Sequence, residues 1–282
     1  MLHLEHLSKY AVFCSSHPNS GNPALVLDTA EQNLAEFQAY AKAENFPILV
    51  CLVPAEKDSF PKIRFFYPNY ETNICVHGAL AAAEHLLNGK SSKVCTVINK
   101  DNEALHLSKE QDRVFITLNP VPPLDKAFNE DEVLSLLGID DSDLDLSLPF
   151  KIASAGSPKV LIPVADLSIL GELKPQFDHI AKWSQENAVK GFYVYTAETE
   201  DKSADFHARN FNPLSGLDED VATGIAAAAL VSCFVELNPT RKFRIEQGLF
   251  LQKPCLIYVQ WDGDRLKVGG NVTKLGGFSS GR

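Results

Sequence analysis

The chain has no run of the roughly 18–20 apolar residues that a membrane-spanning helix needs. Its first residues lack the basic and apolar regions of a secretory signal. Basic residues are few, since 26 Lys and Arg face 36 Asp and Glu, and the net charge is −10. The longest basic cluster is the short stretch Arg241–Arg244, too little to follow nucleic-acid phosphates. We therefore expect a soluble protein that binds neither membranes nor nucleic acid.

Paired cysteines are also lacking. The six cysteines form no C-x-x-C pair and show no metal-ligand spacing. They are Cys14, Cys51, Cys75, Cys95, Cys233 and Cys255. Scattered free thiols are typical of a reducing compartment, so we expect a cytoplasmic protein without a metal site.

What is present is an ordinary globular composition. The 282 residues are 45% apolar and 22% charged, enough for one large domain or two medium ones. Short β-rich strings alternate with a few helical ones. The predicted strands are 10–14, 24–27, 48–53, 63–66, 94–98, 114–118, 160–164, 192–196, 243–246 and 255–261, and the predicted helices are 31–44, 78–87, 130–137 and 225–237.

Two alanine-rich helices follow matching strings of sequence. The string Arg64–Pro68 precedes the helix that begins Gly78–Ala83, and Arg209–Pro213 precedes Gly224–Ala229. The two strings are 145 residues apart and the two helix starts 146, about half the chain. The alternative is that strand–loop–helix segments resemble one another by chance. Two landmarks at nearly one offset favour a duplicated unit.

The start of each helix offers unbonded backbone N–H groups and the positive end of the helix dipole. Both features favour an anion such as a carboxylate. If the two units face each other, both helix starts point into one cleft, which is the default ligand site.

At these residues the chain resembles the PhzF-like (phenazine biosynthesis-like) family, which shares the diaminopimelate epimerase fold. Matching strings occur in order along most of the chain. They are Gly21–Ala24, Phe66–Pro68 with Glu71 and His77, Gly156–Pro158, Glu219–Gly224, Gln247–Gly248, Lys253–Pro254 and Val268–Asn271. The string E-D-V-A-T-G at Glu219–Gly224 is the most specific of them.

The resemblance implies an α+β protein of two pseudo-symmetric domains, each a curled, barrel-like mixed sheet around a central helix. We expect the domains at residues 1–121 and 122–272, with residues 273–282 able to return to the first. The resemblance also implies a homodimer, no cofactor, and a small carboxylate-bearing substrate in the cleft between the domains.

Isomerases of this family move a proton with a Glu, assisted by an Asp and a His. By the resemblance, Asp220 matches the Asp and His77 matches the His. Ile48 stands where the Glu is expected, at the end of Asn45–Ile48, and Ile cannot carry a proton. Ile225 stands in place of a Ser, and Val76 in place of a Gly.

Cys75 is the sharpest candidate to replace the missing base, and Glu44, four residues before Ile48, is an alternative. It lies two residues before His77, where related epimerases carry a proton-abstracting cysteine at a helix start. Those epimerases use a second, facing cysteine, and Val221 holds that position here. The alternative for Cys75 is a small buried thiol. The candidate catalytic residues are therefore Asp220, His77 and Cys75, and the candidate substrate-binding residues are Ile48, Gly78, Thr223, Gly224 and Ile225.

Three functions remain open at this point. The first is a cofactor-independent isomerase or epimerase that transfers protons on a small carboxylate. The second is a catalytically degenerate protein that binds a small carboxylate on the same fold, because Ile48 and Ile225 make the site more apolar. The third is a structural subunit of a dimer.

Overall fold

The computed structural model describes residues 6–30, 33–44, 46–55, 59–119, 121, 124, 126–234, 241–262 and 264–277. The chain divides into unit 1 (Met1–Thr117 with Gly269–Arg282) and unit 2 (Leu118–Val268). It passes between them within strands β8 (Arg113–Leu118) and β16 (Arg265–Gly277). The boundaries expected from the sequence lie a few residues further along. Residues 122, 123 and 278–282, which bear on them, lie outside the described residues.

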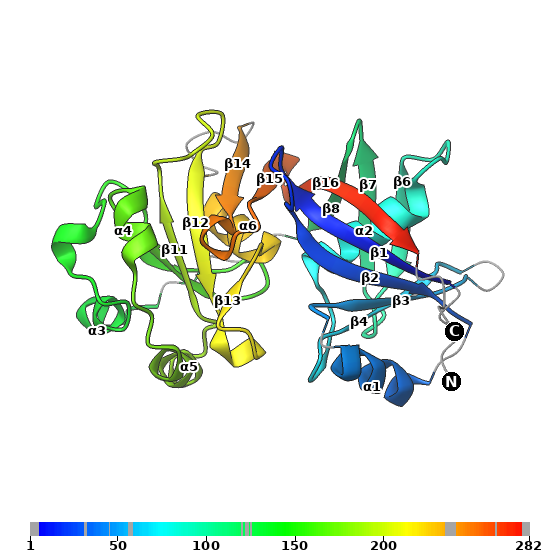
Figure 1. Ribbon diagram of the computed structural model, residues 1–282, viewed down its shortest axis with the longest axis horizontal. Helices are drawn as coiled ribbons and strands as arrows, with labels where there is room; N and C mark the ends of the chain where they lie inside the picture. Colours follow the sequence, from blue (N-terminus) through cyan, green and yellow to red (C-terminus); the bar gives the residue numbers. More distant parts are fainter. Residues whose placement is uncertain are drawn as a thin grey trace. The chain divides into compact units, whose positions relative to one another are not determined.

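Unit 1 is a sheet that closes on itself (Figure 1). Its strands join in the order β1 (Leu7–Cys14), β2 (Asn22–Asp28), β3 (Leu49–Val53), β4 (Lys62–Phe66), β6 (Val94–Ile98), β7 (Ala104–Glu110) and β8. Strand β16 pairs with β8 at one end of this order and with β1 at the other. The short β5 (Glu71–Thr72) pairs with β4.

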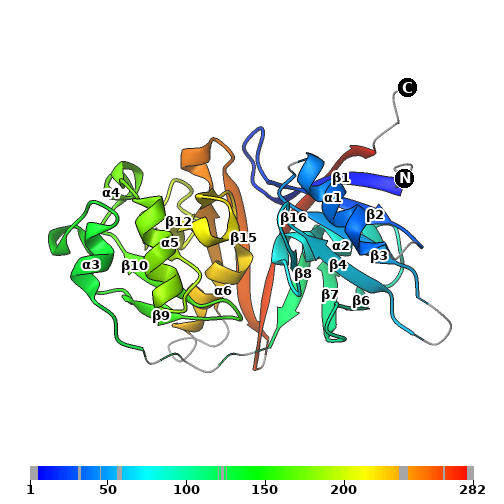
Figure 2. The ribbon, with the colours of Figure 1, turned by 90° about the horizontal axis from the view of Figure 1, so that it is seen from below.

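Helix α2 (Val76–Leu87) lies inside this closed sheet and contacts β1, β2, β3, β6 and β7. Ten of its twelve residues are buried, so it is surrounded by strands on all sides. Its alanines allow this, because small side chains let the helix axis approach the sheet closely. Helix α1 (Leu34–Glu44) instead packs Phe37 and Ala41 on the outside of β3 and β4 (Figure 2).

Unit 2 is a second mixed sheet. Its strands join in the order β9 (Lys151–Ala153), β10 (Lys159–Pro163), β11 (Phe192–Thr196), β12 (Phe206–Phe211), β14 (Lys242–Gln247) and β15 (Cys255–Asp262). The short β13 (Glu219–Asp220) pairs with β12. Helix α6 (Gly224–Ser232) contacts β9 and β10 at one end of the order and β15 at the other, so the sheet curls around it.

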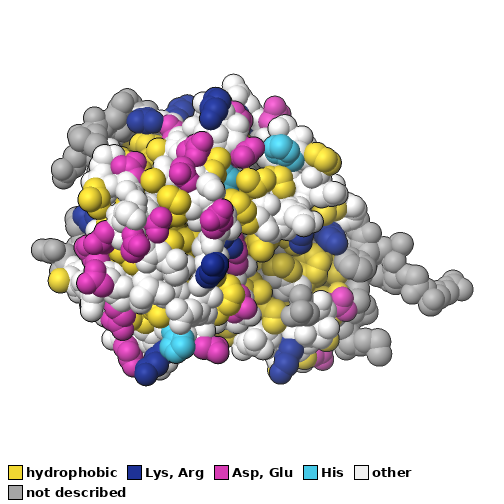
Figure 3. Space-filling model, turned by 60° about the vertical axis from the view of Figure 1, so that its left-hand side comes forward, with side chains coloured by type: hydrophobic (Ala, Val, Ile, Leu, Met, Phe, Trp, Pro, Cys, Tyr) yellow, Lys and Arg dark blue, Asp and Glu magenta, His cyan; other side chains and the backbone are white. Residues whose placement is uncertain are grey.

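The other face of the unit 2 sheet is covered by an apolar core. Helices α3 (Glu130–Ser135), α4 (Leu167–Glu172) and α5 (Phe177–Glu186) supply residues such as Leu170, Ile180 and Trp183 to it. On the face shown in Figure 3, acidic side chains predominate over Lys and Arg, as the net charge predicts. In the described part of the chain, no helix is both long and apolar enough to cross a membrane.

The predicted fold class is confirmed: the protein is α+β, with two curled mixed sheets, each around an alanine-rich helix. Every predicted strand corresponds to an observed one. The sequence did not predict the strands β5, β7, β9, β12, β13 and β16 or the helices α4 and α5. The helix expected at 225–237 is observed at Gly224–Ser232, and residues 235–237 lie outside the described residues. The helix expected at 31–44 is observed as α1, which begins at Leu34. Residues 31 and 32 lie outside the described residues.

Candidate functional site

A strand, a short return strand and a helix recur in both units with the same ion pair. In unit 1 the guanidinium of Arg64 on β4 binds both carboxylate oxygens of Glu71 on β5. In unit 2 Arg209 on β12 binds both oxygens of Glu219 on β13, at 2.9 and 2.7 Å. Glu71 lies opposite Phe66, and Glu219 opposite Phe211, in the two strand pairs. The duplication read from the sequence is therefore present in the three-dimensional structure.

The structure shifts the match between the two helix starts. Between the paired Phe and Glu the chain takes five steps in unit 1 and eight in unit 2, where a 3₁₀ turn, η3 (Pro213–Ser215), fills the extra length. Cys75 and Thr223 are the N-cap residues of α2 and α6. Cys75 therefore corresponds to Thr223, not to Val221, and Gly78 does not correspond to Gly224. The offset of 145 residues between the two matching strings therefore does not hold for the helix starts, because the extra residues of unit 2 lie between the string and the helix.

At the start of α2, two polar side chains converge on the sulfur atom of Cys75. The Sγ of Cys75 lies 3.3 Å from Nδ1 of His77 and 3.4 Å from the hydroxyl of Tyr67. Cys75 and His77 are both buried. Burial by itself raises the pKa of the Cys75 thiol, but the positive charge of His77 and the hydrogen bonds from His77 and Tyr67 outweigh it and lower the pKa. The positive end of the helix favours the thiolate further.

Gly78 and Ile48 lie close to the same helix start. A Cβ at Gly78 would be 3.0 Å from Val50 Cγ2 and 3.1 Å from Phe65 Cδ1, so the helix rests directly on β3 and β4. Ile48 is fully buried, and its carbonyl accepts the Leu25 N–H at 3.0 Å. Because side chains alternate along extended chain, Ile48 points to the same side as Val50. Asn45, which begins the string that led to Ile48, lies outside the described residues.

At the start of α6 the chemistry is different. Asp220 Oδ2 accepts a 2.6 Å hydrogen bond from the Thr223 hydroxyl. Gln247 on β14 donates to the Asp220 carbonyl at 2.8 Å and accepts the Thr223 N–H at 3.1 Å. Gly248 has φ +84°, and a Cβ there would lie 2.4 Å from the Lys253 carbonyl oxygen. Gln247 and Gly248 thus fix the turn that carries Asp220.

Two further candidate residues belong to helix α6. Gly224 is buried in the first turn of α6, and Ile225 beside it is half-buried. The structure therefore groups Cys75, His77 and Gly78 in unit 1. It groups Asp220, Thr223, Gly224 and Ile225 in unit 2.

The sequence reading missed two side chains at these helix starts. Tyr67 was not singled out, although it lies inside the repeated string, because nothing in the sequence shows that its hydroxyl reaches Cys75. Lys159 was also missed. It is 1% exposed on β10, and the charge of Asp220 acts on it. A single Lys in an otherwise apolar strand was the signal that could have found it.

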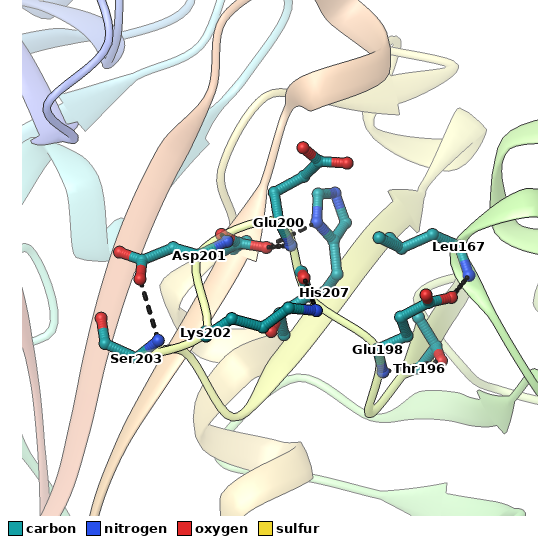
Figure 4. A network of polar contacts seen from close by, with 10 residues as sticks. Leu167, Thr196, Glu198, Glu200, Asp201, Lys202, Ser203 and His207 are labelled. Atoms are coloured by element: carbon teal, nitrogen blue, oxygen red, sulfur yellow. Dashed lines mark hydrogen bonds and ion pairs between the residues drawn. The ribbon is translucent and has the colours of Figure 1, made fainter.

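Unit 2 also contains a buried His–Glu pair that holds a loop in place. His207 Nδ1 donates to Glu246 at 2.9 Å, and Glu246 also accepts the backbone N–H groups of Glu200 and Asp201 (Figure 4). Burial raises the pKa of Glu246, but the bonds from His207 and from the Asp201 N–H outweigh it, so the pKa is lowered. This pair fastens the loop between β11 and β12, and Glu198 in the same loop accepts the Leu167 N–H at the start of α4.

A metal centre is not evident in the described part of the chain, where no three His, Cys, Asp or Glu side chains lie close enough together to hold an ion. All six cysteines are free thiols.

Comparisons with known proteins identify the family. The family model described as "Phenazine biosynthesis-like protein" matches residues 10–277. An uncharacterized isomerase of Mesorhizobium japonicum is 30% identical over 91% of this chain and 92% of its own. The trans-2,3-dihydro-3-hydroxyanthranilate isomerase of Pseudomonas chlororaphis is 23% identical over 93% and 94%.

Solved structures agree on the fold. A Bacillus anthracis phenazine biosynthesis protein of the PhzF family superimposes with a TM-score of 0.82 at 22% identity, covering 96% of this chain and 97% of that one. A hydroxyproline epimerase from Agrobacterium vitis superimposes with a TM-score of 0.51 at 12% identity, covering 98% of this chain and 91% of that one. The chain belongs to the phenazine biosynthesis-like protein family, whose curated relatives are named isomerases.

Proposed function

We propose that this protein is an isomerase or epimerase that transfers a proton on a small carboxylate-bearing substrate, with Cys75 as the base and without a cofactor. The observation that carries the proposal is the cluster of Cys75, His77 and Tyr67 at the start of α2. A lowered pKa makes the thiolate of Cys75 more accessible, and a thiolate can remove a proton from a carbon next to a carboxylate. Membership of a family whose relatives are named isomerases supports this assignment.

The proposed step is balanced in atoms and electrons. The Cys75 thiolate takes a proton from the carbon beside the carboxylate, which leaves the electron pair on the substrate as an enolate and a neutral thiol on the protein. In an isomerisation the Cys75 thiol then gives its proton to a neighbouring carbon, where the electron pair forms the new C–H bond, and the thiolate is restored. In an epimerisation a second acid gives a proton to the same carbon, and the thiol then loses its own proton to water while the second acid regains one. In this proposal Ile48 occupies the position of the family's proton-carrying Glu and contributes an apolar wall.

We assign Asp220 as a second acid–base group. The family resemblance gives it that role, and the Thr223 hydroxyl holds its carboxylate at the first turn of α6. The assignment of Thr223, Gly224 and Ile225 as substrate-binding residues rests on the same helix start, where backbone N–H groups favour an anion.

The experiment is deuterium exchange in D2O. The protein is incubated with a panel of amino acids, hydroxy acids and trans-2,3-dihydro-3-hydroxyanthranilate, the compound in the name of the Pseudomonas chlororaphis relative. We expect deuterium on a substrate carbon, and a loss of about a hundredfold or more in Cys75→Ser and in Asp220→Asn. Cys95→Ser is the matched control and keeps the full rate. No exchange with any compound, or full exchange in Cys75→Ser, would reject the proposed base.

The apolar residues Ile48 and Ile225, which by the family resemblance stand in place of a Glu and a Ser, support a second candidate, a binding protein that holds a small carboxylate without turnover. Thermal-shift screening separates the two candidates. Stabilisation by a carboxylate that gives no deuterium exchange supports the binding protein. Gain of exchange in Ile48→Glu would instead identify residue 48 as the lost proton carrier.

A further inference from the structure

The place of the Tyr67 hydroxyl on the Cys75 sulfur follows from the end of strand β4. Phe66, the last residue of β4, joins the apolar core beneath α1, outside the closed sheet. Phe65 points the other way and lies against Gly78 of α2, inside the sheet. Because side chains alternate along a strand, Tyr67 points inward as Phe65 does. Its hydroxyl thereby comes to 3.4 Å from the Sγ of Cys75.

Gln38 on α1 holds the turn that carries Tyr67. Its side-chain amide donates to two successive carbonyl groups, that of Tyr67 at 2.7 Å and that of Pro68 at 3.0 Å. The Tyr67 N–H donates to the Tyr70 carbonyl at 2.9 Å, which closes the turn between β4 and β5. The two tyrosine rings stack with their centroids 5.0 Å apart. Both backbone polar groups of Tyr67 are thus hydrogen-bonded, and its ring is supported on one side.

Unit 2 has a different arrangement at the same point of the repeat. Asn212 corresponds to Tyr67, because each follows the Phe that pairs with the glutamate of the return strand. The side-chain oxygen of Asn212 is buried and has no hydrogen-bond partner within the described residues. Thr223, the N-cap of α6, is bound by Asp220 instead. The phenol therefore occurs in the unit whose helix begins with a thiol.

A phenol beside a buried sulfur acts differently on the two protonation states of the sulfur. A thiolate accepts hydrogen bonds and donates none, whereas a neutral thiol forms only weak ones. A hydrogen bond from Tyr67 therefore stabilises the charged form more than the neutral form. Cys75 is 5% exposed, so little water is at hand to replace this donor.

We propose that Tyr67 and Gln38 are positioning residues for Cys75: the Tyr67 hydroxyl donates to the thiolate, and Gln38 acts through Tyr67 by fixing its turn. The inference rests on the proposed function of Cys75 as the base. It adds to that site a residue of α1, which lies outside the closed sheet. A loosened turn lets the hydroxyl leave the sulfur, and the thiolate then loses one of its donors.

The test is a titration of the Cys75 thiolate in the full chain without substrate, followed by absorbance at 240 nm. Each variant is compared with the same variant carrying Cys75→Ser, so that the other thiols and the phenols cancel. Tyr67→Phe removes only the hydroxyl and should raise the midpoint by about one pH unit. Gln38→Met keeps the length of the side chain but removes its amide, and should raise the midpoint by about half a unit. In the Tyr67→Phe background Gln38→Met should add no further shift, because its effect passes through the hydroxyl.

Tyr70→Phe and Lys42→Met are the matched controls. The first removes the hydroxyl of the stacked neighbour and the second changes an exposed residue of α1, so both should leave the midpoint unchanged. If Gln38→Met does not fold, Gln38→Asn, which shortens the reach of the amide, replaces it. An unchanged midpoint in Tyr67→Phe overturns the inference, and so does a Gln38→Met shift that is as large without the Tyr67 hydroxyl as with it. The titration uses no substrate, so its failure is distinct from a failure of the deuterium-exchange experiment.

Discussion

The starts of α2 and α6 share one backbone arrangement but carry side chains of different chemistry. Both follow a strand, an Arg–Glu ion pair and a short return strand, and both open an alanine-rich buried helix. At the N-cap one unit carries a thiol, Cys75, and the other a hydroxyl, Thr223. Two residues after the N-cap, His77 in unit 1 corresponds to Ile225 in unit 2.

The difference shows that the two copies of a duplicated unit can carry different functional groups at the same position. In unit 1 an imidazole and a phenol surround a sulfur atom and favour its anion. In unit 2 a carboxylate, that of Asp220, accepts a hydrogen bond from the Thr223 hydroxyl. Because the two units share the same backbone arrangement, the side chains at a few positions decide which proton chemistry each helix start supports.

The largest effect is expected from removing the ion pair in unit 2. Arg209 and Glu219 are 11% and 9% exposed, against 23% and 18% for Arg64 and Glu71. Glu219→Ala leaves a buried, unpaired guanidinium and should lower the free energy of unfolding by about 3–5 kcal/mol. Glu71→Ala should cost about 1–3 kcal/mol, since its partner is better hydrated. Urea unfolding measures both, with exposed Glu172→Ala as the control. Equal losses of unfolding free energy would show that the two Arg–Glu ion pairs contribute equally to stability.

The next effect concerns the pH dependence of stability in unit 2. The pKa of Lys159 is about 7 in the folded protein and about 10.4 in the unfolded chain. Between these values the unfolded chain holds a proton that the folded protein lacks, so stability rises with pH. Relative to Lys159→Met, the native protein should gain on the order of 4 kcal/mol between pH 7 and pH 10. Lys182→Met, on an exposed side chain, should show no such gain in denaturant unfolding.

A smaller effect is expected at the thiol of unit 1. Absorbance of the thiolate at 240 nm, with Cys75→Ser as background, follows the ionisation of Cys75. His77→Gln removes the main attractive charge, so it should raise the pKa of Cys75 and reduce the thiolate at neutral pH several-fold. His85→Gln changes the other histidine of α2, which binds Tyr10 and Asp28 instead. If both variants shift the titration alike, His77 has no special part.

The smallest effect should come from Gly78, where the two helices differ in packing. An added Cβ meets Val50 and Phe65 at 3.0–3.1 Å, whereas Ala226, the corresponding residue of α6, already carries one. Overpacking costs about 1–3 kcal/mol, and the gain in helix propensity returns about 1 kcal/mol. Gly78→Ala should therefore lower stability by about 1 kcal/mol in thermal unfolding. A rise in Tm would show that β3 and β4 can move away from the helix.

The parts of the fold that were predictable have local causes. Apolar and β-branched runs marked strands such as β3, β10 and β11, and composition marked both central helices. Strand β7 was missed because only its Leu105 and Leu107 are buried and the residues between them are polar. Helix α5 was missed although Ile180 and Trp183 are spaced for one helical face.

The sequence by itself determined the family, the repeat and the residue types available at each helix start, because these depend on order along the chain. Only the tertiary structure decided that Tyr67 reaches Cys75 and that Gln247 binds the Asp220 carbonyl. It also showed that the match between the two helices shifts across a three-residue insertion. Those facts depend on strand pairing and burial, which bring side chains together whether they are eight positions apart, as Tyr67 and Cys75 are, or 27 apart, as Asp220 and Gln247 are.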